Sequence, residues 1–184
     1  QRRAARAAEA GMTAGIEAAV AGNNEREVCG AVCSAMVIAG SDHPGPGVLS
    51  SGERAYHLHG GATDRILKAG DTLQLEPTPH VRHYNARFMR TIKVDEATDE
   101  EYKIAETLIN TQDKALETVA PGVKATVPDH LYREGILGSG LTDTYTNKTF
   151  YSIGIMMDPT DADPLEATAS SEWSFEVGMT FHSY

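Results

Sequence analysis

Hydrophobic periodicity changes along this chain, and that change limits the folds it can adopt. The first forty residues are rich in strong helix formers, and apolar residues such as Met12 and Ile16 recur at four-residue, helical spacing. A glycine and two asparagines break this pattern, and Asn24 can cap a second helix. The sequence therefore predicts two helices, over residues 1–21 and 24–39, ahead of any strand.

Beyond these helices the pattern becomes strand-like. In residues 72–77 polar and apolar side chains alternate, which directs Leu73 and Leu75 to one face and Glu76 to the other. Residues 82–94 are expected to form the returning strand, antiparallel to the first. Weaker signals predict a Pro/Gly/Ser loop at 41–52 and a short strand at 54–58.

The clearest helix of the second half begins after Thr98, because Glu101 follows at the spacing of a capping box. A stripe of mainly apolar residues from Tyr102 to Val119 marks the face expected to be buried. The remaining predicted elements are a helix at 128–136 and strands at 150–157 and 173–184. Two helices followed by a strand meander with further helices predict an α+β fold, since the regular βαβ alternation of a parallel sheet is missing.

Charge and cysteine content exclude several classes of function. Sixteen basic and twenty-six acidic residues give a formal net charge of −10, which argues against a nucleic-acid partner bound through its phosphates. No apolar stretch approaches the roughly 20 residues that cross a bilayer, so no membrane partner is expected. Cys29 and Cys33 are interpreted as free thiols, which predicts a reducing, cytoplasmic location. At 184 residues the chain is expected to form one domain, residues 1–184.

Several short segments follow one another in an order that is more informative than any one of them. They are HLHGGATDRILKAGD at 57–71, LEPTPHVRHYNARFMRT at 75–91, ATDEEYKIAE from 97, TFYSIG at 149–154 and FEVGMTFH at 175–182. This series resembles the catalytic domain of the pita-bread superfamily, which includes methionine and proline aminopeptidases, prolidase, creatinase and ectoine hydrolase. The resemblance implies a curved, mainly antiparallel sheet covered by helices, a homodimer, and a domain fragment without its N-terminal neighbour and closing segment.

In the peptidases of this superfamily, two metal ions are held by two aspartates, one histidine and two glutamates. The resemblance places the first four of these ligands at Glu76, Arg87, Tyr151 and Tyr184. An arginine adds positive charge where cations would bind, and neutral tyrosines are poor substitutes for anionic oxygen donors. The chain is therefore predicted to be a non-metal member without a cofactor, similar to ectoine hydrolase and creatinase.

The leading hypothesis is a metal-independent hydrolase of a C–N bond in a small zwitterionic, non-peptide substrate. Glu76 would act as the nucleophile or anchor a cationic group, and His59, at the position of the creatinase histidine, would transfer the proton. Plainer interpretations stay open, with Glu76 as an exposed or salt-bridged carboxylate and His59 as a turn residue.

Four further residues are predicted to bind the substrate, namely Arg87, Tyr151, His182 and His83. Arg87 can bind a substrate carboxylate through two parallel hydrogen bonds, or simply pair with an acid on a neighbouring strand. Tyr151 and His182 match positions of ectoine hydrolase motifs, and packing within a strand is the alternative for both. His83 belongs to a predicted turn.

Two other functions remain open from the sequence. One is a metal-dependent Xaa-Pro aminopeptidase or dipeptidase, which would follow if the ligand positions are misaligned. The other is a non-catalytic binding protein on the same fold.

Overall fold

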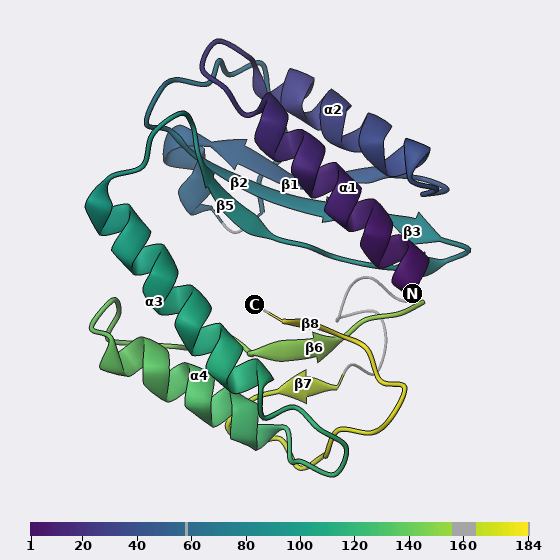
Figure 1. The fold of residues 1–184 in the computed structure, drawn as a ribbon, viewed down its shortest axis with the longest axis vertical. Coiled ribbons are helices and arrows are strands. Elements are labelled where there is room, and N and C mark those ends of the chain that lie inside the picture. Colours follow the sequence, from purple (N-terminus) through teal and green to yellow (C-terminus); the bar gives the residue numbers. More distant parts are fainter. Residues whose placement is uncertain (58, 156–164, 184) are drawn as a thin grey trace. The chain divides into compact units, whose positions relative to one another are not determined.

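The computed structural model describes residues 1–57, 59–155 and 165–183 (Figure 1). Its contacts divide the chain into two compact units. Unit 1 comprises Gln1–Ala97 and a short segment that begins at Gly154, and unit 2 comprises Thr98–Ile153 and the C-terminal segment. The predicted α+β class is confirmed, and the single domain over residues 1–184 stays a prediction.

Two helices form one layer of unit 1, as predicted. They are α1 (Arg2–Ala18) and α2 (Glu25–Ile38), which lie side by side against the sheet in Figure 1. α1 packs through small residues, and at Gly15 an added Cβ would lie 2.3 Å from Cδ2 of Leu75 in the sheet. α2 begins with a capping box in which Asn24 and Glu27 exchange hydrogen bonds between side chain and backbone. Small residues and a local cap thus fix both helices.

The sheet of unit 1 has the strand order β1-β2-β5, and both neighbouring pairs are antiparallel. The central strand β2 (Thr72–Thr78) and the returning strand β5 (Arg90–Lys93) lie where strands were predicted. The edge strand β1 (Gly45–Ser51) corrects the loop predicted at 41–52. Its composition is typical of a loop, but Val48 and Leu49 are buried because β1 pairs with β2.

Gly47 forms the bend in β1 that allows this pairing. The register shifts between Gly45 and Val48, the φ angle of Gly47 is +61°, and an added Cβ would lie 1.7 Å from the carbonyl oxygen of Glu76. We therefore expect Gly47→Ala to lower the free energy of unfolding by about 2 kcal/mol or more in urea titrations. Gly61→Ala is the control, because a Cβ there would meet open space. Equal stability of the two variants would refute this account.

The segment after β1 folds into a 3-10 helix, η1 (Gly52–Tyr56), and corrects the strand predicted at 54–58. From this turn Arg54 forms an ion pair with the buried carboxylate of Glu25. The sequence pattern of a strand gives no sign of this contact. Leu58, the end of the predicted strand, lies outside the described residues.

The strand predicted at 82–94 is interrupted. A two-residue hairpin joins β3 (His80–Val81) to β4 (Tyr84–Asn85). Its turn residues, Arg82 and His83, have φ angles of 50° and 67°, the left-handed conformation that such turns require. Only the last part of the predicted strand therefore joins the sheet, as β5.

The core of unit 1 fills the space between its helices and its sheet. Its fully or nearly fully buried apolar residues are Met12, Val28, Val32, Met36, Leu49, Leu67, Leu73, Leu75 and Val94. Because two leucines of β2 belong to this cluster, the central strand is held firmly in place.

Unit 2 combines two helices with the small antiparallel sheet β7-β6-β8. Its elements are α3 (Asp99–Leu116), α4 (Thr126–Gly138), β6 (Phe150–Ser152), β7 (Glu166–Ala167) and β8 (Phe181–Ser183). Both helices are confirmed, as is the capping box between Thr98 and Glu101. β6 and β8 are shorter than the predicted strands, β7 was not predicted, and residues 156–164 and Tyr184 lie outside the described residues.

The buried face of α3 differs from the predicted stripe. Among the residues of α3 only Ala115 is fully buried, whereas Tyr102 and Ile109 are 65% and 57% exposed. α4 approaches at Gly135, where an added Cβ would lie 2.5 Å from Cγ2 of Thr111. This close approach sets the rotation of α3, so the apolar stripe does not decide it. Of the described helices, none combines the length and hydropathy needed to cross a bilayer.

Candidate functional site

Glu76 lies on β2, opposite Val48 of β1, and its residue surface is only 2% exposed. Alternation along the strand directs it away from Leu75, yet both residues are buried. The reason is an ion pair with Arg87, whose Nε and Nη2 each donate to one oxygen of the Glu76 carboxylate at 2.8 Å. The salt bridge that the sequence left open for Glu76 is therefore present.

Backbone pairing brings Arg87 to this place. The amide of Ala86 donates to the carbonyl of Pro79, and the amide of Phe88 donates to the carbonyl of Pro77, so the segment runs alongside the end of β2. A two-pronged guanidinium–carboxylate pair of this kind is geometrically specific. Arg87 and Phe88 also line a pocket of about 300 Å³ beside α1. The Glu76 carboxylate is thus held through both oxygens, and its predicted role as nucleophile or as anchor of a cationic group stays a prediction.

His59 is exposed at the start of a tightly fixed segment. The carbonyl of Gly60 accepts a hydrogen bond from the Leu49 amide at 2.8 Å, and the carbonyl of Gly61 accepts one from Nη2 of Arg54 at 2.6 Å. The imidazole is therefore presented to solvent from a rigid support. Its predicted role in proton transfer stays a prediction.

A buried carboxylate that the sequence patterns did not reveal holds this segment. Glu25, at the first turn of α2, accepts hydrogen bonds from the backbone and side chain of Ser51, the backbone and side chain of Thr63, and Nη1 of Arg54. Burial alone raises the pKa of Glu25, but the hydrogen bonds from Thr63, Ser51 and Arg54 outweigh it and hold the pKa below its ordinary value. No sequence signal marks Glu25, because its partners come from three other segments.

Tyr151 and His182 face each other in unit 2. They are paired in the register of β6 and β8, their ring centroids are 5.2 Å apart, and both side chains are buried. The structure therefore brings Tyr151 together with His182 in one unit and Glu76 together with Arg87 in the other. The exposed His83 lies in the hairpin turn of unit 1. The substrate-binding roles of these residues stay predictions.

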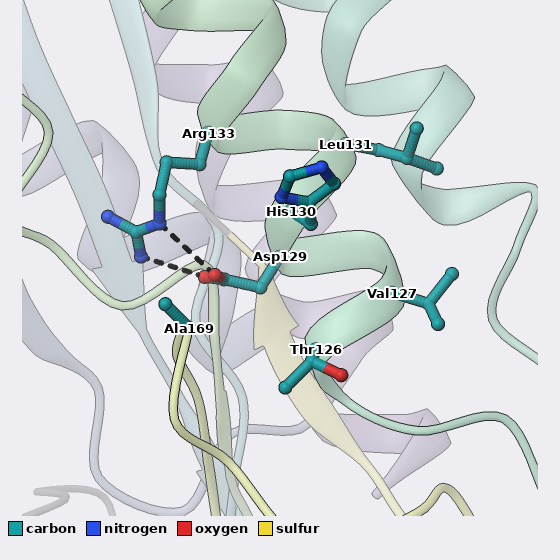
Figure 2. A pocket seen from close by; sticks show the side chains of 7 residues that line it. All are labelled: Thr126, Val127, Asp129, His130, Leu131, Arg133 and Ala169. Atoms are coloured by element: carbon teal, nitrogen blue, oxygen red, sulfur yellow. Dashed lines mark hydrogen bonds and ion pairs between the residues drawn. The ribbon is translucent and has the colours of Figure 1, made fainter.

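A second carboxylate missed from the sequence, Asp129, lies on α4. Figure 2 shows its ion pair with Arg133, in which Nη2 donates to Oδ1 at 2.9 Å and Nε to Oδ2 at 3.1 Å. The hydroxyl of Thr149 donates to the same carboxylate at 2.6 Å. Asp129, Arg133 and His130 line a pocket of about 450 Å³. The four-residue spacing of Asp129 and Arg133 on a helix was the available sequence signal.

Comparison with known proteins identifies the family. The model of the family described as "Metallopeptidase family M24" matches residues 1–183, so the chain belongs to this family. Over 149 residues it is 30% identical to the Xaa-Pro dipeptidase of Pyrococcus furiosus, covering 80% of this chain and 43% of that protein. The pita-bread fold expected from the sequence is thereby confirmed.

Solved structures agree with this assignment. The prolidase from Pyrococcus furiosus matches with a TM-score of 0.86 and 27% identity, covering 97% of this chain and 52% of that one. The dipeptidase PepE from Mycobacterium ulcerans has a TM-score of 0.87 at 23% identity over 97% of this chain and 47% of its own, and shares the fold. The chain thus spans about half the length of the relatives it matches.

These relatives correct the leading functional hypothesis. They carry the names of Xaa-Pro dipeptidases and prolidases, so the hypothesis of a metal-independent hydrolase of a non-peptide substrate, similar to ectoine hydrolase or creatinase, was wrong. The hypothesis rested on a few positions at which the expected metal ligands are replaced, although the rest of the chain is similar to the peptidases. The first alternative, an Xaa-Pro peptidase, agrees better with the comparisons.

The family name implies a metal ion, and the described residues do not fit one. In the described part of the chain, no group of three or more His, Cys, Asp and Glu side chains is arranged to hold a cation. At the two aspartate positions implied by the resemblance, Glu76 is bound through both oxygens by Arg87. Tyr184, at another expected ligand position, lies outside the described residues. No catalytic step through a metal is therefore derived from these side chains.

Proposed function

We propose that the protein hydrolyses the peptide bond of Xaa-Pro dipeptides. The similarity to an Xaa-Pro dipeptidase across 80% of the chain is the observation that carries this proposal. The family match over residues 1–183 and the prolidase fold support it. A peptide substrate replaces the non-peptide zwitterion, while the homodimer and the cytoplasmic location stay predictions.

The test is an assay of the full-length protein on a panel of Xaa-Pro dipeptides, with Xaa-Ala dipeptides of the same first residue as controls. We expect free proline to be released, and the Xaa-Ala controls to be cleaved more slowly. His59→Ala is expected to reduce turnover if His59 transfers the proton, while Glu17→Gln on the exposed face of α1 serves as the control. Cleavage of neither peptide class would reject the proposal.

A second candidate, a peptide-binding protein without hydrolytic activity, is favoured by one observation. Glu76 is locked to Arg87 by two hydrogen bonds of 2.8 Å, which leaves the carboxylate poorly placed for chemistry. Isothermal titration of an uncleaved Xaa-Pro dipeptide separates the two candidates. Saturable binding without release of proline would favour the second, and release of proline would favour the first.

A further inference from the structure

We infer that the described residues of this chain hold no divalent cation, because an arginine already neutralises each of their buried carboxylates. The inference goes beyond the proposed function and does not depend on which substrate the protein binds. It concerns this chain's own side chains within a family whose name implies a metal.

Three carboxylate side chains are fully or almost fully buried in the described residues, namely Glu25, Glu76 and Asp129. Each is bound through both of its oxygens by one arginine, which is Arg54, Arg87 and Arg133 respectively. Arg87 and Arg133 use Nε and Nη2, one for each carboxylate oxygen, whereas Arg54 contacts both oxygens of Glu25 through Nη1 alone. Buried charge is stable in proteins when it is paired and hydrogen-bonded, and here arginine supplies the counter-charge.

Each of the three carboxylates lies in a different element and has its own arginine. Glu25 on α2 and Glu76 on β2 belong to unit 1, whereas Asp129 on α4 belongs to unit 2. Two of them also accept hydrogen bonds from hydroxyl groups, those of Ser51 and Thr63 at Glu25 and that of Thr149 at Asp129. A divalent cation needs several oxygen or nitrogen donors around one point, and the described residues contain no group of three or more His, Cys, Asp and Glu side chains that provides them.

Arg87 is the decisive residue, because it occupies one of the two positions at which the resemblance expects aspartates, and it lies between β4 and β5. Its guanidinium is a cationic group with only donors to offer, and only 15% of its side-chain surface is exposed. A cation that bound Glu76 would have to displace Arg87 from its partner. The displaced guanidinium would then remain largely buried next to a second positive charge.

The first measurement is the metal content of the full-length protein, expressed in medium supplemented with manganese, cobalt and zinc. It is combined with thermal melting in the presence of Mn²⁺, Co²⁺ or Zn²⁺ and in the presence of a chelator. We expect sub-stoichiometric metal and melting temperatures that agree within error. Bound metal in at least equimolar amount that is lost in Glu76→Gln or Asp129→Asn would overturn the inference. Equimolar metal that both variants retain would contradict the expected sub-stoichiometric content and would also count against the inference.

A second pair of variants tests Arg87 directly. Arg87→Gln is expected to lower the melting temperature, and added Mn²⁺ is expected not to restore it, because one carboxylate without converging donors binds a cation weakly. Arg26→Gln is the matched control, since Arg26 pairs with Asp64 on the surface. Restoration of the wild-type melting temperature by Mn²⁺ would contradict the inference. Neither measurement uses a peptide, so failure of the proposed function leaves both results interpretable.

Discussion

Replacing Glu25 with glutamine is expected to lower the free energy of unfolding by about 3 kcal/mol. The substitution removes the charge that five donors from Ser51, Arg54 and Thr63 share, and it leaves the Arg54 guanidinium without its buried counter-charge. Urea unfolding followed by circular dichroism measures the loss. Glu17→Gln is the control, because its exposed side chain lies on the same unit. A loss no larger than that of the control would show that the network contributes little.

The same residue gives a pH dependence with a defined sign. The pKa of Glu25 is lower in the folded protein than its ordinary value, so the folded state holds this proton less tightly than the unfolded chain. Its contribution to stability is therefore present above the unfolded pKa and is lost as the pH falls through the folded pKa. We expect the stability difference between the wild type and Glu25→Gln to shrink as the solution is acidified. A difference that is constant with pH would contradict the assignment.

Replacing Asp129 with asparagine is expected to cost a similar amount, about 3 kcal/mol, and to loosen one loop in particular. Arg133 donates to Asp129 and also to the backbone carbonyls of Tyr145 and Asn147, at 2.6 and 3.1 Å. The ion pair therefore holds the arginine that fastens the loop after α4. Hydrogen exchange measured by mass spectrometry is expected to rise in this loop.

The control for this experiment comes from the same loop. Asp143→Asn changes an exposed carboxylate, so it is expected to leave exchange in the loop unchanged. Exchange that stays low in Asp129→Asn would show that the loop is held by other contacts, such as the packing of Tyr132 against Tyr145.

Local signals predicted the helices of this fold well. The capping box of Thr98 and Glu101 sets the start of α3, and Asn24 sets the start of α2, because the residues that make these contacts are neighbours in sequence. β2 was predicted for the same reason, since alternation is a property of a few consecutive residues. Features of this kind depend little on the rest of the molecule.

Features that depend on distant partners were missed. β1 has the composition of a loop, and only its pairing with β2 makes it a strand. The rotation of α3 about its axis follows from the approach of α4 at Gly135. Tyr102 and Ile109, which belong to the apolar stripe, are therefore exposed. Sequence patterns carry no direct record of such contacts.

The candidate site was predicted in part. The sequence singled out Glu76 and Arg87 separately and allowed Arg87 to pair with an acid, but it did not identify Glu76 as that acid. Tyr151 and His182 were assigned to the site from motif matches, and they prove to be neighbours on adjacent strands. The substrate class was wrong, because a resemblance over short motifs was interpreted without the similarity of the whole chain to Xaa-Pro dipeptidases.

The network around Glu25 also bears on the order of events during synthesis. α1 and α2 leave the ribosome before the donors that stabilise the Glu25 carboxylate, which follow at residues 51, 54 and 63. A Glu25 carboxylate buried before those donors emerged would be an uncompensated charge, which is costly in an apolar interior. The Glu25 carboxylate is therefore expected to stay in water until Thr63 has cleared the exit tunnel, so that this end of α2 packs in one late, concerted step.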